Sequence, residues 1–343
     1  MSYLFAFLTA LILSLVLTPL VRRLMLRFNI LDIPSESRWN QRTVALMGGI
    51  AIFASFVLAT LFRVELQREV YVVVLGATVI FILGALDDYF TTHPKIKFSV
   101  QLGVAVATAF LGVVIKILPY HWLNILVTVF WIVGLTNALN LLDNMDGLSS
   151  GVTIIASVGI FILALMKHQP YIALLSAVLA GSCLGFLRYN FNPAKIFMGD
   201  CGALFLGYTL ATLSILGGWQ SSSPVLNSFL APVLIVGVAI FDTTLVTVLR
   251  LTNGRLPWSG GRDHSSHRLV SIFKGNEKAA VLTLYAVGII IGAVGLLIIK
   301  IGTVPAALAL FSGVSLGLIL FGLRLAKVNC YQNKNVKNAD ALS

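Results

Sequence analysis

The chain carries very little charge. Asp, Glu, Lys and Arg together make up 11% of its 343 residues, against roughly 25% in a typical soluble domain. Hydrophobic residues make up 58% of the sequence, and its mean hydropathy is +0.95. Such a chain cannot cover its apolar side chains with a polar surface, so a soluble globular protein is excluded. The composition predicts a membrane protein.

Cysteine is also scarce. Cys183, Cys201 and Cys330 are far apart and form no CxxC pair, so neither a disulfide framework nor a zinc site is expected. The sequence shows no clear internal repeat, which argues against the inverted-repeat architecture of many transporters. The three cysteines are expected to pack as small apolar side chains.

Long apolar runs dominate the sequence instead. A membrane-spanning helix needs about 20 apolar residues, and the runs near that length are 3–21, 46–62, 70–86, 99–118, 122–139, 151–166, 170–187, 202–219, 229–250, 279–299 and 303–323. We predict an all-α, polytopic membrane protein with about 11 transmembrane helices, or ten if run 99–118 or run 151–166 does not cross. Residues 1–328 form a single domain, and the polar tail 329–343 is expected to be disordered.

Basic residues predict the orientation of these spans, because they mark cytoplasmic loops. The first run has no basic residue before it, and Arg22, Arg23 and Arg27 follow it. This pattern predicts an uncleaved first span with the N-terminus outside. Alternation then places the C-terminus and most of the 24 Lys and Arg residues in the cytoplasm. The net charge of +11 therefore reflects topology, and anionic lipid headgroups explain it without nucleic acid.

Acidic residues are the rarest charged groups, and Asp87 and Asp88 end the run 70–86. They suit an ordinary charged helix end poorly, because a carboxylate opposes the dipole at a helix C-terminus. Lys97 follows in the next loop, either as a cation for a phosphate or as a lysine that reaches the membrane interface.

A second polar group lies between Asn137 and Gly147. Asn137, Asn140 and Asn144 have the spacing of one helical face, and Asp143 and Asp146 follow closely. Amides at this depth can join helices to one another. Two carboxylates beside them favour a functional cavity.

Asp200 is the acidic residue of a third motif, Phe197 to Asp200, just before the run 202–219. It is therefore expected near a helix N-terminus, where the dipole favours a negative group. One interpretation is a simple helix cap. Another is a metal ligand, which requires carboxylate lone pairs that the cap does not use.

The fourth motif runs from Gly260 to Arg268 in the longest predicted cytoplasmic loop. Arg262, His264, His267 and Arg268 offer cationic and hydrogen-bonding groups for an anion. Two histidines three residues apart also suit zinc, but no third ligand lies at a zinc-like spacing. Phosphate binding is favoured over zinc, and a plain basic loop remains an alternative.

Together these motifs predict phosphoryl transfer at the cytoplasmic interface. Carboxylate and amide oxygens suit Mg²⁺ or Mn²⁺, and basic side chains hold the remaining phosphate oxygens. A membrane enzyme with interfacial chemistry suits a lipid as one of its substrates.

The four motifs, in this order, resemble the polyprenyl-phosphate N-acetylhexosamine-1-phosphate transferase family, which contains the MraY and WecA types. The resemblance covers nearly the whole chain, from the Met47-Gly48-Gly49 stretch through LDDYF, NALNLLDNMDGL and FMGDCGALFLG to GGRDHSSHRL. It implies a fold of ten or eleven helices, Mg²⁺ dependence and, in some members, a homodimer. It also implies transfer of a sugar 1-phosphate from a UDP-sugar to undecaprenyl phosphate, with release of UMP.

The resemblance assigns roles to individual residues. It implies that Asp200 is the principal metal ligand, with Asn140 near the metal. It implies that Asp87 and Asp88 are the pair near the lipid phosphate, with Asp143 among the catalytic carboxylates. The implied uridine contacts are Asp146 and Phe197, and the implied phosphate and sugar contacts are Lys97, Arg262, His264, His267 and Arg268.

Departures from the family pattern narrow the donor. The peptidoglycan branch carries three histidines followed by an acidic residue, whereas this loop reads DHSSHRL. UDP-GlcNAc is therefore the expected donor; UDP-GalNAc remains an alternative, and UDP-MurNAc-pentapeptide is disfavoured. The expected location is the bacterial inner membrane, with the active site on the cytoplasmic face. The product pathway stays open between lipopolysaccharide O-antigen, teichoic acid and other cell-wall glycans.

Two further alternatives remain at this point. The lipid phosphate can attack the donor directly, which we favour because a phosphate monoester is largely ionised at pH 7, or a carboxylate can form a phosphoryl-enzyme first. A cation- or proton-coupled transporter is the rival class. Asp242, inside the run 229–250, is the one acidic residue that suits an ion path.

Overall fold

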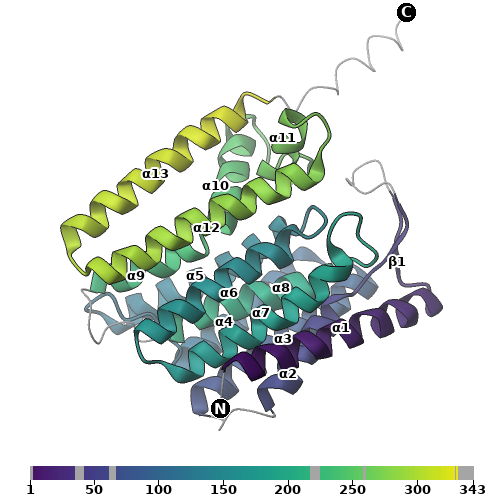
Figure 1. Ribbon diagram of the computed structural model, residues 1–343, viewed down its shortest axis with the longest axis horizontal. Coiled ribbons are helices and arrows are strands. Elements are labelled where there is room, and N and C mark those ends of the chain that lie inside the picture. The colour runs from purple at the N-terminus through teal and green to yellow at the C-terminus, as the bar shows by residue number, and fades with distance from the viewer. Residues whose placement is uncertain are drawn as a thin grey trace, which may run out of the picture.

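The computed structural model describes residues 3–34, 42–61, 67–216, 225–257, 260–328 and 330. It is almost entirely helical (Figure 1), with one short hairpin. The elements are α1 (Tyr3–Arg27), β1 (Leu31–Asp32), β2 (Val44–Ala45), α2 (Gly49–Leu61), α3 (Arg68–Phe90), α4 (Pro94–Phe110), α5 (His121–Leu142), α6 (Leu148–Met166), α7 (Pro170–Asn190), α8 (Gly199–Leu216), α9 (Val225–Ile235), α10 (Gly237–Thr252), α11 (Ser265–Ile272), α12 (Glu277–Ile301) and α13 (Val304–Ala326). The all-α membrane fold predicted from composition is confirmed.

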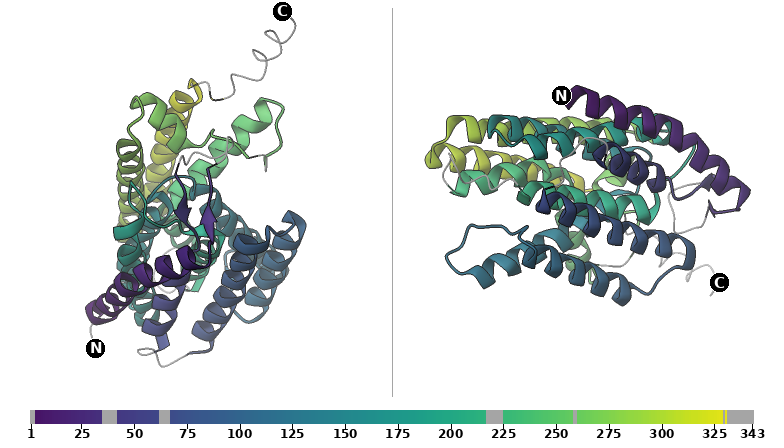
Figure 2. Two further views of the ribbon diagram at one scale, coloured as in Figure 1. Left: turned by 90° about the vertical axis from the view of Figure 1, so that its right-hand side faces the viewer. Right: turned by 90° about the horizontal axis from the view of Figure 1, so that it is seen from below.

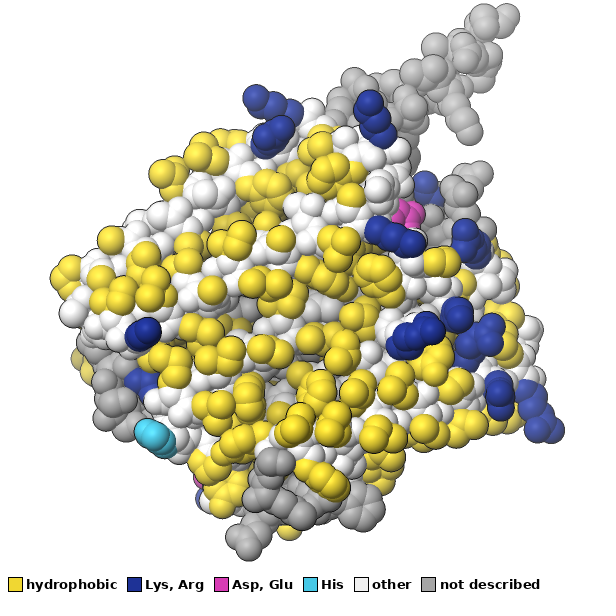
Figure 3. Space-filling model, in the orientation of Figure 1, with side chains coloured by type: hydrophobic (Ala, Val, Ile, Leu, Met, Phe, Trp, Pro, Cys, Tyr) yellow, Lys and Arg dark blue, Asp and Glu magenta, His cyan; other side chains and the backbone are white. Residues whose placement is uncertain are grey.

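Eight helices within the described ranges are long and apolar enough to cross a bilayer: α1, α3, α5, α6, α7, α8, α12 and α13. Most of them run alongside one another (Figures 1 and 2). Lys and Arg side chains gather at one end of the molecule, near the end of α1, and hydrophobic side chains cover the face beside them (Figure 3). The predicted tail 329–343 lies outside the described residues, apart from Cys330.

Helix α8 forms the centre of the bundle. Every side chain from Cys201 to Ile215 is buried, and α3 and α5 pack along it. Glycine permits this close packing at Gly84, where a Cβ atom would lie 2.5 Å from the Asp200 carbonyl oxygen. The C-terminal end of α3 and the N-terminal end of α8 are thereby held side by side.

Two predicted runs differ from single straight helices. The run 99–118 overlaps α4, which ends at Phe110, and the rest of the run is not helical. Near its end, Asn124 Oδ1 accepts hydrogen bonds from the backbone N–H groups of Ile117 and Leu118 at 3.2 and 3.0 Å. The run 229–250 is divided into α9 and α10, which meet at an angle of 75°. Pro232 lies one turn before this break, where its ring removes a helical hydrogen bond.

The hairpin fastens the N-terminal third of the chain to the segment that leads into α8. Strands β1 and β2 pair antiparallel, and Ala45 also pairs with Ile196. Backbone hydrogen bonds of 2.8 Å join Gly48 N to Phe197 O and Gly49 N to Met198 O. These contacts fix the position of the Phe197–Asp200 turn.

Candidate active site

The four predicted motifs meet at one cavity of about 860 Å³. Its wall lies where α3 ends and α8 begins, and it also includes the α5–α6 connection and the segment before α11. The wall contains these predicted site residues: Asp87, Asp88, Asn140, Asp143, Asp146, Phe197, Asp200, Arg262 and His267. Segments that are distant in the sequence therefore form one site.

An ammonium group lies between two of the carboxylates. Lys97 Nζ donates to Asp87 Oδ2 at 2.7 Å and also to Asp200 Oδ2. Asp200 Oδ1 accepts a hydrogen bond from Asn140 Nδ2 at 3.0 Å. On Asp87, Oδ1 accepts from the N–H of Thr92 at 2.8 Å and from its hydroxyl at 2.5 Å. Lys97 is thus an ion-pair partner of two site carboxylates.

Asp88 has a different position from Asp87. Its two carboxylate oxygens accept hydrogen bonds from the backbone N–H groups of Asp200 and Cys201, at 2.8 and 3.0 Å. The side chain therefore caps α8 from a neighbouring helix, and the interpretation of Asp200 as the cap of its own helix is wrong. Gly199 makes room for this contact, because its φ is +75° and a Cβ there would lie 2.5 Å from Asp88 Oδ2.

The three asparagines of the second motif have separate roles. Asn137 Nδ2 donates to Gln101 Oε1 at 2.5 Å, so it joins α5 to α4, as the helix-joining interpretation predicts. Asn140 contacts Asp200. Asn144 Oδ1 accepts from Ser266 Oγ at 2.5 Å and links this motif to the histidine-containing segment.

Two carboxyl groups, Asp143 and Asp146, lie at the α5–α6 connection. Asp146 Oδ2 accepts from Ala194 N at 2.8 Å, yet burial and the nearby Glu277 raise the pKa of this carboxyl. Burial, followed by the charges of Asp200, Asp88 and Asp146, raises the pKa of Asp143 to about 8. The cavity therefore favours the binding of a cation.

The raised pKa of Asp143 predicts a pH-dependent stability. Between the ordinary value of 3.8 and the folded value of about 8, the folded protein binds more protons than the unfolded chain, so stability falls as pH rises. The substitution Asp143→Asn removes this dependence. In thermal unfolding with EDTA, the variant should melt above the unmodified protein, and the difference should grow from pH 5 to pH 8. An equal difference at both values would contradict the prediction.

The segment from Gly260 to Arg268 brings only two of its four predicted site residues to the cavity. Arg262 and His267 line the wall, whereas His264 and Arg268 are buried against other elements. Burial, assisted by His264, lowers the pKa of His267 to about 4, so this imidazole is neutral at pH 7. Arg262 supplies the positive charge on this side.

Sequence reasoning missed several wall residues, among them Arg42, Asn192 and Glu277. Asn192 Nδ2 donates to Glu277 Oε2 at 2.5 Å and lies 3.5 Å from Asp146 Oδ2. Glu277 is the first residue of α12 and lies more than 100 positions after Asp146 in the sequence, so no local pattern connects the two. For Asn192, the sequence does offer a signal, because the Asn192-Pro193 pair indicates a loop shortly before Phe197.

The carboxylates around Lys97 are chemically suited to Mg²⁺. Asp87, Asp200 and Asn140 present hard oxygen atoms, and the Lys97 ammonium shows that a cation is stable between the two carboxylates. No group of three His, Cys, Asp or Glu side chains among the described residues encloses a metal alone. Mg²⁺ is commonly held by one or two carboxylates, with substrate phosphates completing its coordination.

Comparisons with known proteins identify the family of this chain. Residues 70–218 match the model of glycosyl transferase family 4. The chain is 36% identical to a Bacillus subtilis protein named as a probable undecaprenyl-phosphate N-acetylglucosaminyl 1-phosphate transferase, over 97% of this chain and 93% of that one. It is 32% identical to a decaprenyl-phosphate N-acetylglucosaminephosphotransferase of Mycolicibacterium smegmatis, over 82% and 79% of the two chains.

A more distant relative represents the peptidoglycan branch. The phospho-N-acetylmuramoyl-pentapeptide-transferase of Staphylococcus carnosus is 29% identical, over 85% of this chain and 96% of that protein. The likeness to the first relative covers almost the full length, including all four motifs that surround the cavity. The chain therefore belongs to the polyprenyl-phosphate N-acetylhexosamine-1-phosphate transferase family of multi-pass membrane enzymes.

Proposed function

We propose that the protein transfers N-acetylglucosamine 1-phosphate from UDP-N-acetylglucosamine to undecaprenyl phosphate. The products are undecaprenyl-diphosphate-N-acetylglucosamine and UMP. The observation that carries this proposal is the convergence of Asp87, Asp200 and Asn140 with Arg262 and His267 on one cavity. Carboxylates for a divalent ion thus face the same space as groups for phosphate oxygens. The Bacillus subtilis and Mycolicibacterium smegmatis relatives have names that specify N-acetylglucosamine.

We further propose Mg²⁺ as the cofactor, with Mn²⁺ able to replace it. Asp200 and Asp87 would hold the ion, with Asn140 beside them. When bound, it neutralises charge that develops on the donor diphosphate during transfer. In this proposal Lys97 leaves the space between the carboxylates and contacts a phosphate oxygen, since its flexible side chain can move.

Direct transfer is the mechanism that the geometry favours. An oxygen of the lipid phosphate forms a bond to the β-phosphorus of the donor, and the bond from that phosphorus to the bridging oxygen breaks. The bonding electrons leave with UMP. Oδ1 of Asp87 accepts two hydrogen bonds from Thr92, and Oδ2 would contact the divalent ion once Lys97 has moved away. This environment suits a side chain that orients the attacking phosphate better than one that attacks phosphorus itself.

The proposed location is the cytoplasmic face of the bacterial inner membrane, at the first membrane step of an envelope glycan. The basic end of the molecule in Figure 3 supports this orientation. Asp242, the residue that suited a transporter, has two buried protein partners, Ser265 and His264. A continuous ion path through it is therefore disfavoured.

A donor panel tests the proposed reaction. Detergent-purified protein with undecaprenyl phosphate should release UMP from UDP-GlcNAc faster than from UDP-GalNAc or UDP-MurNAc-pentapeptide. EDTA should stop the reaction, and Mg²⁺ should restore it. Release from UDP-GalNAc alone would correct the sugar, whereas no release from any of the three donors would contradict the reaction class.

A further inference from the structure

The segment from Gly260 to Arg268, which we call the basic segment, is divided between two environments. Arg262 and His267 line the cavity. Asp263, His264 and Arg268 are buried and bonded to other parts of the protein. The division means that some charged side chains of this segment hold it in place, while others face the substrate space.

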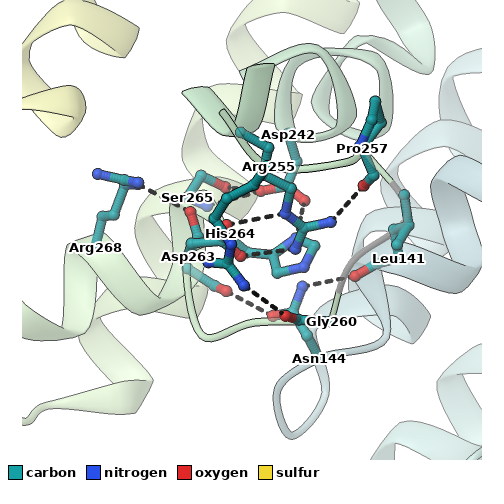
Figure 4. Close-up of polar contacts among 12 residues, drawn as sticks. Leu141, Asn144, Asp242, Arg255, Pro257, Gly260, Asp263, His264, Ser265 and Arg268 are labelled. Atoms are coloured by element: carbon teal, nitrogen blue, oxygen red, sulfur yellow. Dashed lines mark hydrogen bonds and ion pairs between the residues drawn. The ribbon is translucent and has the colours of Figure 1, made fainter. Parts of the chain in front are cut away.

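One face of α10 supplies the first contacts with the buried side of this segment. Asp242, Val246 and Arg250 recur every four residues and are all buried. Asp242 Oδ1 accepts from the backbone N–H of Ser265 at 2.8 Å and from its hydroxyl at 2.5 Å, and Oδ2 lies 2.8 Å from His264 Nδ1. Asp242 therefore caps the N-terminus of α11 and orients the His264 ring (Figure 4).

Arg250 makes the second contact, two turns further along α10. Its Nε and Nη2 atoms donate to the two oxygens of Asp263 at 2.9 and 2.7 Å, and Nη1 donates to Pro257 O at 2.6 Å. Both partners of this ion pair are 1% exposed. The negative Asp242 of α10 thus faces the positive N-terminus of α11. The positive Arg250 of α10 faces the negative Asp263 of the basic segment.

Two more contacts fix the end of the segment. Arg268 Nε donates to Asp263 O at 2.9 Å, and its Nη1 donates to Leu325 O and Val328 O near the end of α13. Ser266 Oγ donates to Asn144 Oδ1. The segment is therefore held on several sides, and Arg262 and His267 are the members whose side chains line the cavity.

Buried charges of this kind are costly and add little net stability over apolar residues of similar size. In some proteins such buried groups specify register. If the segment moved by one residue along α10, Asp263 would take the place of Arg262 at the cavity. A carboxylate would then face the donor diphosphate in place of a guanidinium.

We propose that Asp242 and Arg250 are positioning residues for donor binding, which hold the basic segment so that Arg262 and His267 face the UDP-sugar. Neither residue touches the substrate. This inference rests on the proposed function for the identity of the donor. It predicts that their substitution weakens the donor site and spares the lipid site.

The test measures donor binding without lipid acceptor, so that it does not depend on turnover. The variants are Asp242→Asn, which keeps an acceptor for Ser265, and Arg250→Lys, which keeps the charge but cannot form the two-pronged contact with Asp263. Calorimetry with UDP-GlcNAc and Mg²⁺ should show about 10-fold weaker binding in both. Lys300→Gln, on an exposed site at the far end of α12, should bind like the unmodified protein.

Two further readouts separate positioning from general damage. Hydrogen exchange of residues 261–270 should accelerate in Asp242→Asn, with residues 200–216 of α8 unchanged. In the UMP assay, the KM for UDP-GlcNAc should rise about 10-fold while the KM for undecaprenyl phosphate stays within about 2-fold. Unchanged donor affinity in both variants, or equal increases in both KM values, would overturn the inference. If the unmodified protein binds UDP-GlcNAc but shows no activity, this result counts against the proposed reaction and leaves the positioning inference unaffected.

Discussion

Replacing Asp200 by asparagine is expected to lower UMP formation by at least about 100-fold. Asp200 lies between Lys97 and Asn140, and it is the acidic residue closest to the start of the central helix. The amide has nearly the same shape as the carboxylate, so α8 should remain packed. The amide lacks, however, the negative charge that the proposed divalent ion requires. Without this ion, the charge that develops on the donor diphosphate in the transition state should no longer be neutralised.

The measurement is the kcat of detergent-purified enzyme at saturating UDP-GlcNAc, undecaprenyl phosphate and Mg²⁺. Glu69→Gln is the matched control, because Glu69 is an exposed acidic residue at the opposite end of α3 from Asp87. It should leave kcat within about 2-fold and the melting temperature unchanged. Asp200→Asn with more than half of the normal activity would exclude this residue from the reaction.

Replacing Asp88 by asparagine is expected to damage both stability and activity. Its two oxygens accept the N–H groups of Asp200 and Cys201, whereas an amide offers one acceptor and turns a donor toward the other N–H group. Losing such a helix cap costs about 1–2 kcal/mol. Because the start of α8 also sets the position of Asp200, activity should fall by about 100-fold or more.

Thermal unfolding distinguishes the two aspartates. Asp88→Asn should lower the melting temperature by a few degrees, whereas Asp200→Asn should leave it close to that of the unmodified protein. Raising the Mg²⁺ concentration should not restore Asp88→Asn, since the defect lies in the backbone around Asp200. A fully stable Asp88→Asn enzyme would contradict the capping role.

Most of the fold follows from composition and run length. Runs of hydrophobic residues predict the eight long helices, because a segment inside a bilayer must satisfy its backbone polar groups internally and a helix does so. The break between α9 and α10 was less accessible. Pro232 is visible in the sequence, but proline is tolerated inside many membrane helices. The close contact between Ile291 of α12 and Gly237 at the break joins residues far apart in the sequence.

The candidate site is predictable in its parts and less so in its connections. Rare carboxylates at the ends of apolar runs indicate Asp87 and Asp200, because charge is costly there without a function. The sequence does not show that Asp88 caps α8, since this contact joins residues more than 100 positions apart. Nor does it show which basic residues face the cavity. By residue type alone, His264 and Arg268 cannot be distinguished from His267 and Arg262. Only the packing of His264 against α10 and of Arg268 against α13 distinguishes the two pairs.

The position of a bound divalent ion is the measurement that tests the central claim most directly. Mn²⁺ scatters anomalously, so a crystal with Mn²⁺ and UDP-GlcNAc would locate both the ion and the donor diphosphate. The account predicts the ion about 2 Å from an oxygen of Asp200, beside Asp87, with the diphosphate between it and Arg262. An ion bound away from Asp200, or a diphosphate outside this cavity, would contradict it.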